Sequence, residues 1–289
     1  MNMKKFDGIL IVSDLDGTFF NGKPETHEKN VRAIERFKSG GGIFTFATGR
    51  DHYSLLTVVP DAEKIANAPI IIANGARLYD KDKKEYLYTF TLNMTLFSEF
   101  WEIAVEKYPD IGVRFSGEKG IIIPVLNEIM KQDFNDVALR NIKFREMPVK
   151  ELAESGEDVY KCVIVHTPEI LDDVRRIGES FDKFDKDINR DLFYTKSYPR
   201  GLEVVDKKSS KGEMSLRLKE YVSTKYNMAV KLFAIGDYDN DISLIESADY
   251  GAAPENALDH VKKSAKIRTV SCGDGAVADL IDIIEREYV

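Results

Sequence analysis

Cysteine is scarce in this sequence, with only Cys162 and Cys272 among 289 residues. Two cysteines so far apart provide neither a disulfide framework nor the ligand spacing of a zinc site. We therefore expect both to be reduced packing residues of a cytoplasmic protein. Histidine is also scarce, and its four residues lack metal-ligand spacing, so we expect them to be structural or surface residues: His27, His52, His166 and His260.

Long apolar runs and an excess of positive charge are both missing. No apolar stretch approaches the length of a membrane-spanning helix, and Asp7, Asp14 and Asp16 interrupt the first one too early for a signal peptide. The formal net charge is −8, whereas general nucleic-acid binders and membrane-surface binders need a basic face. We therefore expect a soluble intracellular protein with neither kind of partner. A small anionic substrate stays compatible with this charge, because a few local cations can bind it.

The most informative segment runs from Ile9 to Thr18. Its first part, Ile9–Ser13, is uncharged and rich in β-branched residues, which predicts a short strand buried on both faces of a parallel sheet. Asp14 and Asp16 follow, where open α/β sheets bind ligands beyond the carboxyl ends of their strands. Because side chains alternate along an extended backbone, the two carboxylates can take different roles. A plain turn is the alternative for this segment alone.

Strands and helices alternate at both ends of the chain. Apolar segments at 43–47, 69–73 and 230–235 predict further buried strands with helices between them. Polar, alternating strands in the middle predict a separate α+β unit on an antiparallel sheet, which includes a charged connection at 182–191. The predicted fold class is therefore α/β, with a Rossmann-like, doubly wound parallel-sheet core domain and an inserted α+β domain. The core domain comprises residues 1–84 and 206–289, and the insert comprises residues 85–205.

Polar residues gather at the ends of the predicted strands or at a helix start. They are Asp14 with Asp16, Thr48 with Gly49, Lys211, and Asp237 with Asn240 and Asp241. In a parallel sheet these loops would open at one edge. Clustered carboxylates repel one another unless a cation neutralises them, and oxygen ligands together with phosphate favour Mg²⁺. A lysine and hydroxyl or backbone donors complete a cradle for a phosphoryl group, which an ionised carboxylate can attack.

Each cluster also has an ordinary structural explanation. Lys211 is compatible with a solvated surface lysine, Thr48 and Gly49 with a strand-to-helix cap, and residues 237–241 with an acidic helix N-terminus. The joint occurrence of all clusters at strand ends favours the chemical interpretation.

The same residues resemble the haloacid dehalogenase-like hydrolases. The motifs occur in the order typical of that family, namely DLDGT at 14–18, ATGR at 47–50, KG at 211–212 and GDYDND at 236–241. An insert between the second and third motifs resembles the Cof-type sugar-phosphatase branch, which carries a large α/β cap. The segments NGA at 74–76 and ENA at 255–257 also resemble that branch. This resemblance implies a phosphatase that acts on a small phosphorylated metabolite, with a sugar phosphate as the favoured substrate.

The resemblance also implies a role for each motif residue. Asp14 would be the nucleophile and a metal ligand, and Asp16 would be the general acid and base with its backbone carbonyl on the metal. Lys211 would offset the charge of Asp14 and of the phosphate. The remaining implied roles are metal binding for Asp237, phosphate binding for Thr48, Gly49 and Asn240, and a supporting or metal-facing position for Asp241. From the residues alone, Arg50 is a candidate supporting residue of this site, and Arg50, Arg114 and Arg200 are candidate cations for the substrate, although exposed arginines are common.

Two other functions are compatible with these residues. A phosphomutase of the same superfamily would return the phosphate to a bound sugar, and only an assay of phosphate release separates it from a phosphatase. A non-enzymatic phospho-acceptor module would also cluster acidic residues and a lysine around Mg²⁺. Asp16 and the insert argue against that module, because stable phosphorylation needs neither.

Overall fold

The computed structural model describes residues 4–133, 143–181 and 192–289. The chain divides into two compact units, one formed by Met1–Tyr88 with Ser210–Val289 and the other by Thr89–Ser209. The limits predicted for the insert, residues 85 and 205, each lie a few residues before those of the second unit. The charged connection predicted at 182–191 lies outside the described residues.

A five-stranded parallel sheet forms the centre of the first unit, with the strand order β14-β13-β12-β1-β2. Its strands are β1 (Ile9–Ser13), β2 (Ile43–Phe46), β12 (Lys231–Ile235), β13 (Tyr250–Pro254) and β14 (Ile267–Thr269). In the register of the sheet, Leu10 lies between Leu232 and Ile43. Strand β1 therefore has a parallel neighbour on each side, and residues that follow it lie between two other loops.

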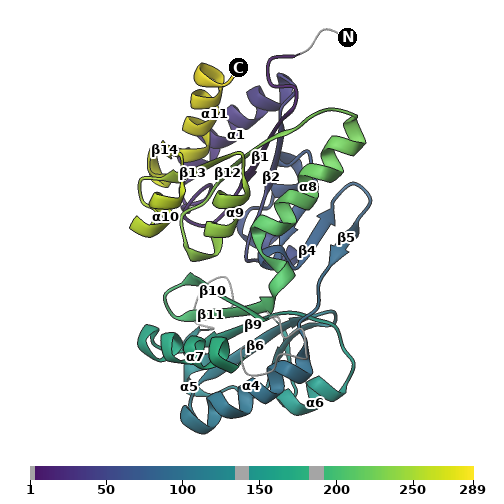
Figure 1. The fold of residues 1–289 in the computed structure, drawn as a ribbon, viewed down its shortest axis with the longest axis vertical. Coiled ribbons are helices and arrows are strands. Elements are labelled where there is room, and N and C mark those ends of the chain that lie inside the picture. Colours follow the sequence, from purple (N-terminus) through teal and green to yellow (C-terminus); the bar gives the residue numbers. More distant parts are fainter. Residues whose placement is uncertain (1–3, 134–142, 182–191) are drawn as a thin grey trace. The chain divides into compact units, whose positions relative to one another are not determined.

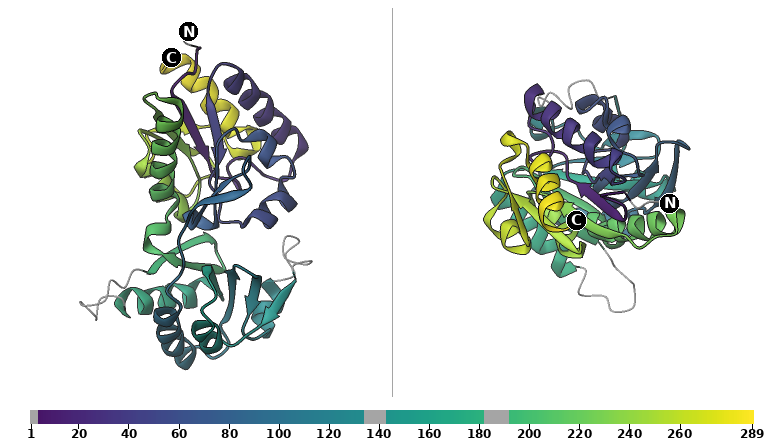
Figure 2. Two further views of the ribbon diagram at one scale, coloured as in Figure 1. Left: turned by 90° about the vertical axis from the view of Figure 1, so that its right-hand side faces the viewer. Right: turned by 90° about the horizontal axis from the view of Figure 1, so that it is seen from above.

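Helices cover both faces of this sheet. Helices α1 (Pro24–Ser39) and α11 (Ala276–Glu287) pack together, while α8 (Lys211–Tyr226) and α9 (Ile242–Ser247) form a second pair. Figure 2 shows α1 and α8 on opposite sides of β1. Ile9 and Ile11 belong to the core that includes α1 and α11, whereas Leu10 is buried and points to the other face. This arrangement confirms the doubly wound α/β fold.

A small antiparallel sheet with the strand order β3-β4-β5 also belongs mainly to the first unit. Its strands are β3 (Ile70–Ile72), β4 (Arg77–Asp80) and β5 (Glu85–Thr89). Strand β3 meets the end of β2 through a parallel bridge between Ala47 and Ile71, but it pairs along its length with β4. The turn Ala73–Gly75 is too short for a crossover to a parallel strand, so the chain folds straight back.

The remaining short helices of the first unit are α2 (His52–Val58), α3 (Ala62–Ile65) and α10 (Asp259–Ser264). Strand β5 pairs with β4 in this sheet, and its Tyr86 side chain packs on two side chains of β4. The Arg77 guanidinium lies 3.2 Å from the centre of the Tyr86 ring, and the Tyr79 and Tyr86 rings are 5.4 Å apart. Cation–π and ring contacts thus fasten an otherwise exposed strand.

The second unit contains a six-stranded sheet with the order β10-β11-β9-β6-β7-β8 (Figure 1). Its strands are β6 (Gly112–Gly117), β7 (Gly120–Ile123), β8 (Phe144–Glu146), β9 (Val159–Val165), β10 (Leu192–Tyr198) and β11 (Gly201–Asp206). All neighbouring pairs are antiparallel except β7 with β8. The α+β character expected of the insert is confirmed, with one parallel pair added.

Helices cover both faces of this second sheet. Helices α4 (Met94–Lys107), α6 (Val149–Glu154) and α7 (Pro168–Phe181) share a core that includes buried Cys162, and α5 (Glu128–Asp133) packs on Val163, on the opposite face. Both cysteines are free and buried, which confirms the prediction of packing residues. No helix in the described part of the chain is long and apolar enough to cross a membrane.

Gly212 allows α8 and α9 to approach closely, because a Cβ at this position would collide with the backbone of Ser243. We expect Gly212→Ala to lower the free energy of unfolding of the first unit by about 1–3 kcal/mol, because neither helix backbone can move cheaply. Thermal unfolding of the variant would measure this. Glu220→Ala, an exposed position of the same helix, is the matched control and should leave the midpoint nearly unchanged.

Candidate active site

A buried ammonium group lies between two carboxylates from distant parts of the chain. Lys211 is the first residue of α8, whose N-cap Ser210 accepts a hydrogen bond from the Glu213 amide at 3.1 Å. The Lys211 Nζ atom lies 2.6 Å from Asp14 Oδ1 and 2.6 Å from Asp241 Oδ1. The side chain of Lys211 is fully buried, so this amine is no solvated surface lysine.

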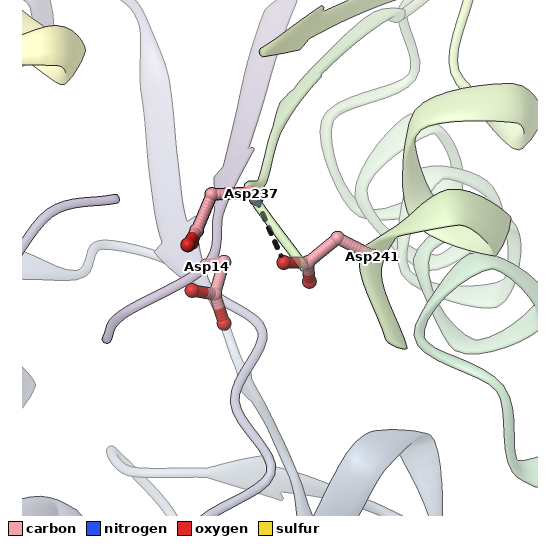
Figure 3. Close-up of side chains that lie close together, drawn as sticks. All are labelled: Asp14, Asp237 and Asp241. Carbon is pink, nitrogen blue, oxygen red and sulfur yellow. Dashed lines mark hydrogen bonds between the residues drawn. The ribbon is translucent and has the colours of Figure 1, made fainter. Parts of the chain in front are cut away.

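Three aspartates converge at the carboxyl edge of the parallel sheet. Asp14 follows β1 and Asp237 follows β12, while Asp241 ends the short turn Asp239–Asp241. One oxygen atom from each of Asp14, Asp237 and Asp241 lies within 4.8 Å of the others (Figure 3). The convergence follows from the sheet, since the amide of Asp14 donates to the carbonyl of Ile235 at 2.9 Å and so aligns the two loops.

The three carboxylates differ in how many protein donors they meet. Asp241 accepts hydrogen bonds from Lys211 and from the backbone amides of Asp237 and Tyr238, at 3.0 and 3.2 Å (Figure 3 draws the first of these amide bonds). Asp237 accepts one hydrogen bond from the Thr18 hydroxyl at 2.6 Å. Asp241 therefore braces the loop, which leaves Asp14 and Asp237 as the carboxylates better placed to act on a ligand.

Gly17 is required by the same arrangement. Its φ is +83°, and a Cβ at this position would lie 2.5 Å from Asp237 Oδ2. Its amide donates to the carbonyl of Phe20 at 3.0 Å, which closes the turn after Asp16. A glycine after the second aspartate thus lets the β1 loop pass next to the Asp237 carboxylate.

Burial and mutual repulsion shift the pKa values of these groups. Burial, followed by the charge of Asp241, raises the pKa of Asp14 well above its usual range, although Lys211 opposes this shift. The same two causes raise the pKa of Asp237 to about 7. Burial alone would lower the pKa of Lys211, but Asp14 and Asp241 outweigh it and the net shift is upward. The lysine stays charged, while Asp14 and Asp237 lack enough nearby positive charge to ionise easily.

This donor set fits a divalent cation. Three carboxylates facing one ammonium group leave two uncompensated negative charges, and the donors of this group are all oxygen atoms. Hard cations such as Mg²⁺ prefer oxygen ligands and commonly bind a few carboxylates together with substrate phosphate. Asp14 and Asp237 are the side chains with the fewest competing donors, so they fit the ligand positions best.

Thr48, Gly49 and Asn240 lie in loops that border the acidic group. The amide of Ala47 donates to the carbonyl of Ser13 at 2.8 Å, which places Thr48 beside the start of the Asp14 loop. Thr48 and Asn240 are buried. The hydroxyl of Thr48 accepts a hydrogen bond from the amide of Arg50 at 3.1 Å.

Asn74 links two of these loops, a role that the sequence did not reveal. Its Oδ1 accepts a hydrogen bond from Asn240 Nδ2 at 3.0 Å and would lie 3.1 Å from a Cβ added at Gly49. The φ of Asn74 is 55°, in the left-handed region that asparagine tolerates. The available signal was an Asn-Gly pair directly after a buried strand, which here serves the site as well as the turn.

Asp16 is not one of the three aspartates of the acidic group. Its two carboxylate oxygens accept hydrogen bonds from Arg50, with 2.8 Å from Nε to Oδ2 and 2.9 Å from Nη2 to Oδ1. The Asp16 side chain is 47% exposed, against 8% for Asp14. The two aspartates of the DLDGT motif thus face different surroundings, but strand alternation is not the reason, because residues two apart lie on the same face of an extended strand.

Each histidine contacts a carboxylate outside the acidic group. Among the described residues, none of the four histidines belongs to a group that could bind a metal ion. The pairs are His27–Asp61, His52–Glu63, His166–Asp110 and His260–Asp239. These contacts support structural or surface roles.

Comparison with known proteins places this chain among phosphatases. A family model described as haloacid dehalogenase-like hydrolase matches residues 11–281. A 5-amino-6-(5-phospho-D-ribitylamino)uracil phosphatase of Bacillus subtilis is 24% identical over 289 residues, covering 94% of this chain and 96% of the relative. A pyridoxal phosphate phosphatase of Escherichia coli is 26% identical over 271 residues, covering 89% of this chain and 92% of the relative.

Solved structures show the same fold. A crystal structure from Thermotoga maritima matches with a TM-score of 0.72 and 26% identity, covering 94% of this chain and 96% of that one. A sugar phosphatase of HAD subclass IIB matches with a TM-score of 0.75 and 20% identity, covering 94% of this chain and 97% of that one. At its identity, the second match bears on the fold alone.

The pKa of Asp237 generates a prediction for the metal-free protein. Its value of about 7 exceeds the usual 3.8, so the folded state binds this proton more tightly and its stabilisation is lost as the pH rises through about 7. We expect the unfolding temperature to fall between about pH 5 and about pH 8, and Asp237→Asn to flatten that fall. Mg²⁺ should restore more stability at the higher pH, because protons then no longer compete for the carboxylates.

Thermal unfolding with and without Mg²⁺ would measure these effects. Asp259→Asn is the matched control, because that carboxylate is 91% exposed on α10. An unchanged pH slope in Asp237→Asn, or an equal Mg²⁺ effect at both pH values, would contradict the prediction.

Proposed function

The chain is a phosphatase of the haloacid dehalogenase-like hydrolase family, and on that premise we propose that it hydrolyses a small phosphorylated metabolite in a Mg²⁺-dependent reaction through an aspartyl-phosphate intermediate. The observation that carries this proposal is the buried contact of Lys211 with Asp14, within 2.6 Å, inside a group of three aspartates. A carboxylate that faces an ammonium group and lies beside a cation site can meet a phosphate ester, because two positive charges offset the repulsion between the two anions.

Asp14 is the nucleophile in this proposal. It lies at the carboxyl end of the central strand, and Lys211 contacts only its Oδ1 among the hydrogen bonds found. Its Oδ2 can therefore attack phosphorus while the ammonium keeps the carboxyl group oriented. The raised pKa of the metal-free carboxyl group means that positive charge nearby is needed to keep it ionised.

Asp16 is the general acid and base. Its exposed position, outside the buried acidic group, suits a group that exchanges protons with a leaving oxygen and with water. The nucleophile must be ionised while the acid carries a proton, and the two aspartates occupy environments different enough to allow this.

Thr48, Gly49 and Asn240 bind the phosphoryl oxygens in this proposal. Backbone amides and side-chain donors at loop ends suit an anion, and Asn74 holds the Asn240 side chain by a hydrogen bond of 3.0 Å. Asp14, Asp237 and the backbone carbonyl of Asp16 would hold Mg²⁺, which when bound neutralises charge between the nucleophile and the phosphate. Asp241 supports the site through its hydrogen bonds to Lys211 and the Asp237 amide.

A sugar phosphate is the proposed substrate class. The relatives named above act, by their names, on a ribityl phosphate and on pyridoxal phosphate, so small phosphate esters are the common chemistry. Substrate choice is assigned to the inserted domain, and the cytoplasm is the proposed location. A screen of phosphate release over sugar, nucleotide and cofactor phosphates, with and without Mg²⁺, tests the proposal. Transfer to a second sugar without phosphate release would instead indicate a phosphomutase.

Asp14→Asn should abolish turnover, because an amide cannot form the acyl phosphate. We expect p-nitrophenyl phosphate hydrolysis to fall below about a thousandth of the wild-type rate, while the unfolding temperature does not fall, since one repelling charge is removed. Asp259→Asn is the control for a distant carboxylate. Substantial hydrolysis by Asp14→Asn would exclude Asp14 as the nucleophile.

Asp16→Asn should arrest the enzyme at or before the phosphoenzyme. We expect steady-state turnover to fall by about two to four orders of magnitude, because both proton transfers are lost. With an aryl phosphate, whose leaving group needs no proton, the variant should accumulate phosphorylated protein, which intact-protein mass spectrometry after rapid quenching detects. Normal turnover with sugar phosphates would contradict the role of Asp16.

A further inference from the structure

Arg50 binds the carboxyl group of Asp16 by a bidentate contact. Its Nε and Nη2 atoms donate to Oδ2 and Oδ1 at 2.8 and 2.9 Å. A guanidinium fork that meets both oxygens fixes the plane and the direction of a carboxyl group, which a single contact cannot do. The Arg50 side chain is more buried than the carboxyl group that it holds, at 22% against 47% exposed.

Arg50 is itself anchored at both ends. Its amide donates to Thr48 Oγ1 at 3.1 Å, and its carbonyl accepts from the amide of Ala73 at 2.9 Å. The guanidinium Nη1 donates to the Ser54 hydroxyl at 3.0 Å. Ser54 is buried in α2, where its amide donates to the N-cap side chain of Asp51 at 2.7 Å. The fork is therefore built into the loop after β2 rather than free to follow Asp16.

We propose that Arg50 is the positioning residue of the reaction, which orients the Asp16 carboxyl group for proton transfer; this inference rests on the proposed function. One Asp16 oxygen must turn to the leaving oxygen of the substrate, and the other remains on the guanidinium. Because one oxygen stays on the Arg50 guanidinium, the Asp16 carboxyl group can reorient only by turning about that hydrogen bond.

Asp16, which Arg50 orients, transfers a proton in each half of the reaction. An Asp14 oxygen forms a bond to phosphorus while the bond from phosphorus to the ester oxygen breaks, and the Asp16 carboxyl group gives its proton to that oxygen, so that an alcohol leaves. In the second half, the Asp16 carboxylate accepts a proton from water, the water oxygen bonds to phosphorus, and the acyl phosphate bond to Asp14 breaks. Orthophosphate and the original carboxyl groups result.

The first test compares leaving groups in single-turnover kinetics. We expect Arg50→Met to slow phosphorylation of Asp14 by an alkyl or sugar phosphate about tenfold or more, because the departing alkoxide needs the proton. With 2,4-dinitrophenyl phosphate, whose leaving group needs none, the burst rate should stay within about twofold of wild type. The loss should lie in kcat rather than in KM. Arg50→Lys should remain impaired, because an ammonium group cannot form the fork.

The second test places Arg50→Met in an Asp16→Asn background. If Arg50 acts through Asp16, the double variant should show the same burst rate with 2,4-dinitrophenyl phosphate, and the same residual rate with the alkyl ester, as Asp16→Asn alone. Ser54→Ala should give a smaller defect of the same kind as Arg50→Met. Arg32→Met is the matched control, since that arginine pairs with Glu28 on the surface of α1 with 70% of its side chain exposed.

The outcomes separate this inference from the proposed function. A wild-type protein that releases no phosphate from any ester would overturn both. An active wild type whose Arg50→Met variant loses both ester classes equally, or loses neither, would overturn the positioning role alone. Additive losses in the double variant, or full activity of Arg50→Lys, would do the same.

Discussion

The contact of one buried ammonium group with two carboxylates is the constraint on which this structure depends. Lys211 lies between Asp14 and Asp241, and no water-exposed surface of its side chain remains to solvate the charge. Buried charges are tolerated only when they are paired and hydrogen-bonded. The pairing joins the end of β1, the start of α8 and the turn after β12, so closing the first unit and assembling the site are the same event.

The parallel sheet explains why the site lies where it does. Strand β1 lies between β2 and β12, and its carboxyl end is therefore bordered by the loops that carry Thr48 and Asp237. All the polar groups of the candidate site come from the first unit. In the sequence, however, the whole second unit, Thr89–Ser209, separates Asp14 and Thr48 from Lys211 and Asp237. Chain order thus has little bearing on which residues meet, whereas strand order decides it.

Much of the fold could be predicted because its signals are local. The strand Ile9–Ser13, the helix Lys211–Tyr226 and the fold class follow from apolar runs, periodicity and strand-helix alternation. The sequence did not predict that the strand at 69–73 starts an antiparallel sheet, because the same apolar run serves either sheet type. It also did not predict strand β6 (Gly112–Gly117), whose mixed polar and apolar residues make sense only against β9.

By itself, the sequence determined the strand–helix alternation and the identity of the residues at the strand ends, since both are read from neighbouring positions along the chain. Only the tertiary structure decided which polar side chains meet. Arg50 donates hydrogen bonds to Asp16, and Asn240 donates one to Asn74. Asp241 accepts a hydrogen bond from the Asp237 amide and so stabilises its own loop. The direction of a polar side chain depends on donors and acceptors that the fold brings from far along the chain. These donors and acceptors come together only when the chain has folded.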